Sequence, residues 1–248
     1  MNRPGSDDSP VRSTGPTRTD EGDADEQSGV VGNERLTALA GAALLVLIVV
    51  ELVTMPNLRS LMSAHVFVGL LLAGPLAVKL GSTGYRFFRY YTKNPAYRRK
   101  GPPRLALRVL APLLVAVTLV LVGSGIGLLL TGPIQPGPVL ALHAISAVLW
   151  LPVIAIHVFA YVWREPRLIA DDWRQQPIEQ APGRGIRLGV NLGALVGVLI
   201  VAFLMYPLAS PWIAWITTTG DPPGQAFFIV GSVAAVLALL ATRPLRWR

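Results

Sequence analysis

Three histidines, His65, His143 and His157, are the only ones in this 248-residue chain, and each lies in a long apolar stretch. His143 and His157 are fourteen residues apart. On a helix this spacing gives a rise of about 21 Å and a rotation of four turns less about 40°. Both imidazoles therefore face the same way near opposite surfaces of a membrane. This spacing suits two metal centres held one above the other.

The apolar stretches themselves predict membrane helices. Hydrophobic residues make up 52% of the chain and charged residues only 15%. Uninterrupted apolar runs of about eighteen residues or more indicate helices that cross a bilayer, and their lack of alternation argues against strands. The sequence predicts an all-α membrane protein, a bundle of six transmembrane helices over residues 36–53, 61–80, 109–130, 139–162, 188–208 and 226–241.

The first 34 residues have a different composition. They contain eight acids and three arginines among Ser, Thr and Gly, so we expect a disordered acidic cytoplasmic tail over 1–34. They lack the basic start and adjacent apolar run of a secretory signal. We expect a four-helix haem-binding bundle over 35–163, with a basic cytoplasmic loop at 81–106, and two further transmembrane helices over 164–248 that flank it.

The distribution of positive charge predicts the orientation. The segment from Lys79 to Arg108 carries nine basic residues and no acid, and further arginines lie between the fourth and fifth predicted spans and at the end of the chain. The opposite connections carry one base, Arg59. The positive-inside rule then predicts a multi-pass protein of the cytoplasmic membrane with both termini in the cytoplasm. The net charge of +8 is thus a topology signal and does not predict nucleic-acid binding.

The absence of cysteine limits the chemistry. Disulfides, cysteine-ligated iron–sulfur clusters and thioether-linked haem are excluded, so a bound metal or haem must use histidine, carboxylate, methionine or lysine. The sequence contains no nucleotide-binding glycine loop, no zinc-type histidine pair and no hydrolytic triad, and no catalytic residue is predicted.

His65 and His143 are predicted to share one depth. Each lies four residues into a span that runs from outside to inside, and a b-type haem between two helices needs one axial imidazole from each. Small residues nearby leave room for a flat ring. Gly69 follows His65 by one turn, and Gly123, Gly125 and Gly127 lie at the same depth in the third span. Plain helix packing is the competing explanation for these glycines.

This pattern resembles the membrane cytochrome b families, which hold two haems in a four-helix bundle. The resemblance rests on the second and fourth spans, on the His-x13-His spacing and on residues 36–163. The stretch GYRFFRYYTKNPAYRRKGPPR, from Gly84 to Arg104, looks like a loop of uncharacterised actinobacterial membrane proteins related to these cytochromes. The resemblance implies haem b as cofactor and electron transfer between quinone and a partner oxidoreductase, as a subunit rather than as a stand-alone enzyme.

The chain departs from this family at one ligand position. The family has four ligating histidines, whereas here Lys79 stands fourteen residues after His65, at the depth of His157. Three alternatives remain open: the second haem is absent, it binds through His157 alone, or Lys79 ligates it as a neutral amine. The ordinary interpretation of Lys79 is a lysine that extends to the inner headgroups.

Other features have two interpretations each. Glu51, near the outer surface, is a proton acceptor or an interfacial partner of Arg59. Trp212 and Trp215 are expected to anchor their loop at the outer interface. For the whole chain, the alternatives to a haem protein are a haem-free transporter or channel with histidine proton relays, and a membrane anchor subunit of a larger complex.

Overall fold

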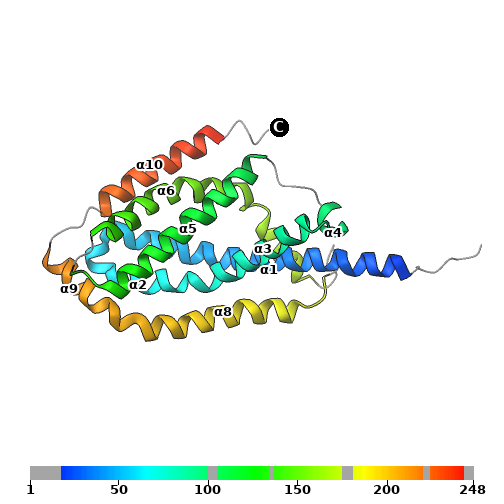
Figure 1. Ribbon diagram of the computed structural model, residues 1–248, viewed down its shortest axis with the longest axis horizontal. Coiled ribbons are helices and arrows are strands. Elements are labelled where there is room, and N and C mark those ends of the chain that lie inside the picture. The colour runs from blue at the N-terminus through cyan, green and yellow to red at the C-terminus, as the bar shows by residue number, and fades with distance from the viewer. Residues whose placement is uncertain (1–17, 100–104, 135–136, 175–180, 220–223, 243–248) are drawn as a thin grey trace, which may run out of the picture.

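The computed structural model describes residues 18–99, 105–134, 137–174, 181–219 and 224–242, which form helices joined by short connections (Figure 1). No strand occurs within these ranges, so the predicted all-α class is confirmed. In chain order the helical segments are α1 (Arg18–Thr54), η1 (Met55–Asn57), α2 (Leu58–Leu71), α3 (Ala73–Tyr91), α4 (Pro95–Arg99), α5 (Leu105–Thr131), α6 (Gly137–Tyr161), α7 (Glu165–Asp172), α8 (Arg184–Met205), η2 (Tyr206–Ala209), α9 (Ser210–Thr218) and α10 (Gly224–Thr242).

The first half of the fold is a long hairpin. The chain reverses at the short 3-10 turn η1, and α2 and α3 then run back along α1. α2 and α3 form almost one continuous rod, interrupted only at Leu72. The interruption follows from Pro75, which has no N–H to donate to the Leu71 carbonyl four residues earlier.

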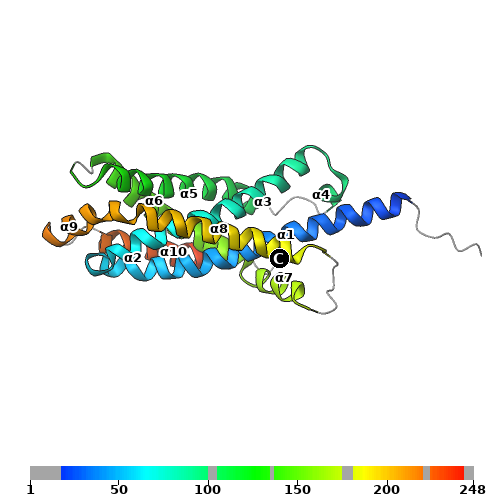
Figure 2. The same cartoon turned by 90° about the horizontal axis from the view of Figure 1, so that it is seen from below.

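The helices form two groups. In one group α1 packs against α3, and α3 against α8; in the other α5 packs against α6, and α6 against α10. Figure 1 shows α10 and α8 on opposite sides of the molecule, and in Figure 2, seen from below, α8 lies in front of α10. The groups meet where α10 contacts η1 and where α5 contacts α2 and η2.

Four helical stretches are long and apolar enough to cross a membrane: Glu26–Tyr91, Arg108–Thr131, Gly137–Tyr161 and Arg184–Thr218. The first contains the hairpin, and Ala226–Ala241 is a shorter apolar helix. Many large hydrophobic side chains on these helices face outward, including Leu149, Phe203 and Leu237, each more than half exposed. Such a surface indicates contact with lipid. All six predicted ranges lie on helices, and the six crossings themselves stay a prediction.

Part of the expected disordered tail is ordered. Residues 18–34 form the first turns of α1, whereas 1–17 lie outside the described residues. Val30 is buried in a cluster with Ala96 and Tyr97 of α4. The Glu34 carboxylate accepts hydrogen bonds from Arg86 and Arg164. These partners lie far away in the sequence, so the composition of the tail alone could not predict them. The predicted basic loop is likewise partly helical, because α3 continues to Tyr91 and α4 follows.

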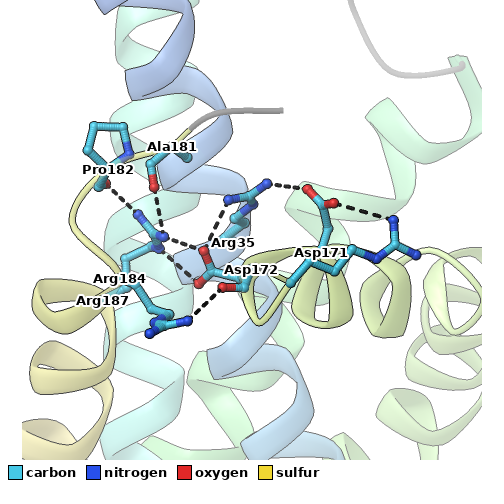
Figure 3. A network of polar contacts seen from close by, with 8 residues as sticks. Arg35, Asp171, Asp172, Ala181, Pro182, Arg184 and Arg187 are labelled. Atoms are coloured by element: carbon cyan, nitrogen blue, oxygen red, sulfur yellow. Dashed lines mark hydrogen bonds and ion pairs between the residues drawn. The ribbon is translucent and has the colours of Figure 1, made fainter. Parts of the chain in front are cut away.

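A buried charge cluster joins α1, α7 and α8 at the end of the bundle where the basic segments gather (Figure 3). Arg35 of α1 donates to Asp171 and, at 3.1 Å, to Asp172 of α7. Arg187 of α8 donates to Asp172 and to the carbonyls of Ala181 and Pro182. The Arg35, Asp172 and Arg187 side chains are at most 7% exposed. Buried charges are tolerated only when paired in this way.

Candidate functional site

A cavity of about 680 Å³ occupies the space between the two helix groups. This volume lies in the range of sites that hold cofactors and other small molecules. Its walls come from α1, α2, α3, α5, α6, α9, α10 and the first residue of α7, and most of the lining is Leu, Val, Ile and Ala. The polar lining includes all three histidines together with Glu51, Lys79 and Glu165. The structure therefore brings the predicted site residues His65, His143, His157 and Lys79 to one cavity.

His65 of α2 is held by α1. Its Nδ1 lies 2.6 Å from Glu51 Oε1 and 3.2 Å from Thr54 Oγ1. An ionised carboxylate only accepts hydrogen bonds, so this contact indicates that Nδ1 carries a proton. Nε2 is then the ring nitrogen that could bind a metal. Glu51 therefore contacts His65, and Arg59 donates instead to the Thr217 carbonyl at 3.0 Å.

His143 of α6 is held in the same manner by α5. Its Nδ1 lies 3.1 Å from the Leu121 carbonyl oxygen and 3.1 Å from Ser124 Oγ. The carbonyl accepts, so Nδ1 carries the proton here too, and Nε2 keeps its lone pair. Metal-binding histidines characteristically donate their other ring N–H to a carboxylate or a backbone carbonyl. Both rings have this arrangement.

The two rings lie close together across the gap between the groups. The centroids of His65 and His143 are 6.4 Å apart, and the ring planes are at 81°. Two bonds of roughly 2.0 Å from imidazole nitrogens to one metal ion place the ring centres roughly 6 Å apart, since each nitrogen lies roughly 1.1 Å from its centre. The observed separation therefore fits one iron between two imidazoles. Among the described residues no group of three or more metal-binding side chains occurs, and a haem needs only this pair.

The predicted glycines have separate roles. A Cβ at Gly125 would lie 3.0 Å from His143 Cε1, so the absence of a side chain lets the imidazole approach α5. A Cβ at Gly69 would lie 3.7 Å from Glu51 Oε1, in ordinary contact, and Gly69 lines the cavity. A Cβ at Gly127 would contact Val139, so this glycine serves the packing of α5 on α6. Gly123 has no neighbour within 4 Å of a Cβ.

The other end of the cavity has a different character. Lys79 Nζ of α3 donates to Glu165 Oε1 of α7 at 2.8 Å. His157 packs on the Tyr161 ring, with the ring centroids 5.0 Å apart. All four side chains line the cavity. Fourteen residues of helix separate each pair of positions, His65 from Lys79 and His143 from His157, so this end lies about 21 Å from the histidine pair.

Several site residues were missed by the sequence analysis. Trp212 was expected at the membrane interface, but it is 3% exposed and donates from Nε1 to the Leu128 carbonyl at 2.8 Å. It lines the cavity together with Trp215 of α9 and Phe227 and Phe228 of α10. The last predicted span and α9, the short helix before it, therefore bound the cavity directly. The sequence does not distinguish these aromatic residues from lipid-facing ones, because both kinds occur within apolar stretches.

Comparison with known proteins adds no identification. No family model, no curated protein and no solved structure matches this chain.

Proposed function

We propose that this chain is a membrane electron-transfer protein that binds haem b between His65 and His143. The observation that carries the proposal is the placement of two imidazoles, each held through Nδ1 by a neighbouring helix and coming from different helix groups, with ring centroids 6.4 Å apart in one apolar cavity. An isolated structural histidine needs only one hydrogen-bond partner. Both rings are held through Nδ1, and among the described residues neither Nε2 makes a hydrogen bond. At the separation required by a single metal ion, this arrangement fits ligation better than packing.

The chain's residues fit a haem in four respects. His65 and His143 would supply the axial nitrogens, and Glu51 and the Leu121 carbonyl orient the two rings. Gly125 gives the His143 ring room against α5. The mostly apolar walls would contact the faces of the porphyrin ring. An iron porphyrin with two imidazole ligands supplies one-electron transfer, and its potential is tuned by ligand hydrogen bonds and by burial.

We place the protein in the cytoplasmic membrane with six crossings and both termini in the cytoplasm. Support comes from the basic segments, which gather at the end of the bundle occupied by α4, α7 and the start of α8. The bias of Lys and Arg toward one side sets orientation in membrane proteins. The electron partners we propose are the quinone pool and a partner oxidoreductase, as the resemblance to cytochrome b implies.

A reduced-minus-oxidised absorption spectrum of the purified full-length chain tests the proposal. Cells supplied with a haem precursor should yield coloured protein with a b-type haemochrome, and His65→Ala or His143→Ala should remove the bound haem. Added imidazole should restore binding to His143→Ala, because the cavity then admits a free ligand in place of the side chain. Colourless wild-type protein from such cells would overturn the proposal. Proton-coupled uptake by the same colourless protein in liposomes would favour the transporter.

A further inference from the structure

The second end of the cavity repeats the spacing of the first end but not its chemistry. Lys79 and His157 occupy the positions at which a second pair of axial ligands would stand, fourteen residues beyond His65 and His143. The inference drawn from this end rests on the proposed haem at the first end and concerns how many haems one chain binds.

Lys79 forms an ion pair with Glu165. Its Nζ lies 2.8 Å from Glu165 Oε1, and the two side chains are only 20% and 23% exposed. An ammonium group that donates to a carboxylate has no lone pair for iron. In a largely apolar cavity the pair is also costly to separate, because removing one partner leaves the other charge buried alone. Lys79 therefore does not reach the headgroups as a free snorkelling side chain, and it is not placed to ligate.

α1 is shaped to admit this ion pair. A Cβ at Gly41 would overlap Lys79 Nζ and would lie 2.7 Å and 2.9 Å from the two Glu165 carboxylate oxygens. Only glycine leaves room for both charged groups against the helix backbone. Three segments thus meet at this point: α1 through Gly41, α3 through Lys79 and α7 through Glu165.

His157 has no histidine partner at this end. The chain has three histidines, and the other two form the pair at the first end. The His157 ring packs on Tyr161, its neighbour one turn along α6. A haem here would have a single imidazole on one face and a Lys–Glu ion pair near the other.

We propose that each chain binds a single haem, at His65 and His143, because the Lys79–Glu165 ion pair seated against Gly41 occupies the position of the second ligand set. Lys79 is then an ion-pair residue and not an axial ligand, and His157 is a cavity-lining residue packed on Tyr161. This resolves the three alternatives left open by the sequence in favour of the first.

The test is the haem-to-protein ratio of the purified full chain, measured by pyridine haemochrome and quantitative amino-acid analysis. One haem per chain is expected for the wild type. The matched variant is Lys79→Arg, because a guanidinium keeps the contact with Glu165 and stays protonated, so it cannot ligate iron. Lys79→Arg and His157→Ala should both retain one haem with an unchanged low-spin spectrum.

The outcomes separate this inference from the proposed function. Two haems per wild-type chain would overturn the single-haem inference and leave the proposed function intact. A haem lost, or a changed low-spin spectrum, in Lys79→Arg or His157→Ala would do the same. No haem at all in the wild type would overturn the proposed function.

Discussion

The two ends of the cavity are built on the same helices with the same spacing, yet they hold their polar groups differently. At the His65–His143 end, the two imidazoles are oriented by Glu51 and by a backbone carbonyl. At the Lys79–His157 end, a lysine is paired with a carboxylate. The first arrangement leaves ring nitrogens available to a ligand, and the second satisfies its charges internally.

Spacing alone therefore does not define a ligand set. What distinguishes the ends is the neighbour supplied by a distant segment. Glu51 comes from α1 and fixes a histidine, whereas Glu165 comes from α7 and captures a lysine. α7 also carries the acids of the buried charge cluster. There Asp171 and Asp172 pair with Arg35 of α1, and Asp172 pairs with Arg187 of α8.

The largest expected effect is in the buried charge cluster that joins α1, α7 and α8. Asp172→Ala removes the shared partner of Arg35 and Arg187 and leaves two buried guanidinium groups short of a counter-charge. The free energy of unfolding should fall by about 3–5 kcal/mol, measured by denaturation in detergent micelles. Arg174→Ala is the control, since Arg174 is 53% exposed and its ion pair with Asp171 should contribute less than about 1 kcal/mol. Equal losses in the two variants would contradict the comparison.

The next effect is at the histidine end. Glu51→Ala removes the carboxylate that orients His65, and haem affinity should fall by about 10- to 100-fold, as measured by titrating haem into the apo-protein. Glu51→Gln should lose less, because its amide oxygen still accepts from Nδ1. If Glu51→Ala bound haem as tightly as the wild type, orientation by Glu51 would have no part in the site.

A smaller effect is expected at Gly125. In Gly125→Ala the new methyl group lies 3.0 Å from His143 Cε1, so the ring must turn from its position. An off-rotamer displacement costs about 0.5–1.5 kcal/mol, which corresponds to about a two- to tenfold loss of haem affinity. Gly123→Ala, two residues earlier on α5 and without any neighbour within 4 Å, should leave affinity unchanged. A loss shared by both variants would point to α5 itself and not to the His143 contact.

The smallest effect is expected at Gly41. Gly41→Ala pushes against Lys79 and Glu165, whose flexible ends can rotate aside, so the protein should lose about 1 kcal/mol of stability. The haem-to-protein ratio should not change. Gly81→Ala, on α3 with open space around the new methyl, should instead stabilise by about 0.5–1 kcal/mol. Stability changes of opposite sign in thermal denaturation would show that the loss in Gly41→Ala arises at the ion pair. A similar loss of stability in Gly81→Ala would contradict this explanation.

Some of the site could be predicted because helical periodicity is local. The positions of His65 and His143 at one depth follow from the boundaries of the apolar stretches, and both residues line the cavity. Gly125 was predicted as a small residue near the cofactor, and the structure places it against His143 itself. Glu51 was recognised as unusual in an apolar stretch, but the sequence suggested Arg59 as its partner, since the shortest separation is the only guide without a fold.

Other features depended on contacts between distant segments. Residues 18–34 have a composition typical of disorder, yet Val30 packs on α4, and Glu34 pairs with Arg86 of α3 and with Arg164 between α6 and α7. Trp212 looks like an interfacial anchor in sequence and is buried in the structure. The surroundings of a side chain depend on the helices that pack around it, and the local sequence does not specify those helices.

By itself the sequence determined the helical fold class, the long apolar stretches and the two sets of positions fourteen residues apart, since hydrophobicity and the helical repeat act over a few turns. Only the tertiary structure decided that α2 and α6 face each other across a cavity, that Glu51 orients His65, and that Glu165 takes Lys79. Those outcomes depend on charges and hydrogen-bond acceptors on other helices, from 14 residues away for Glu51 and His65 to 86 for Lys79 and Glu165, and these groups become neighbours only after the helices pack.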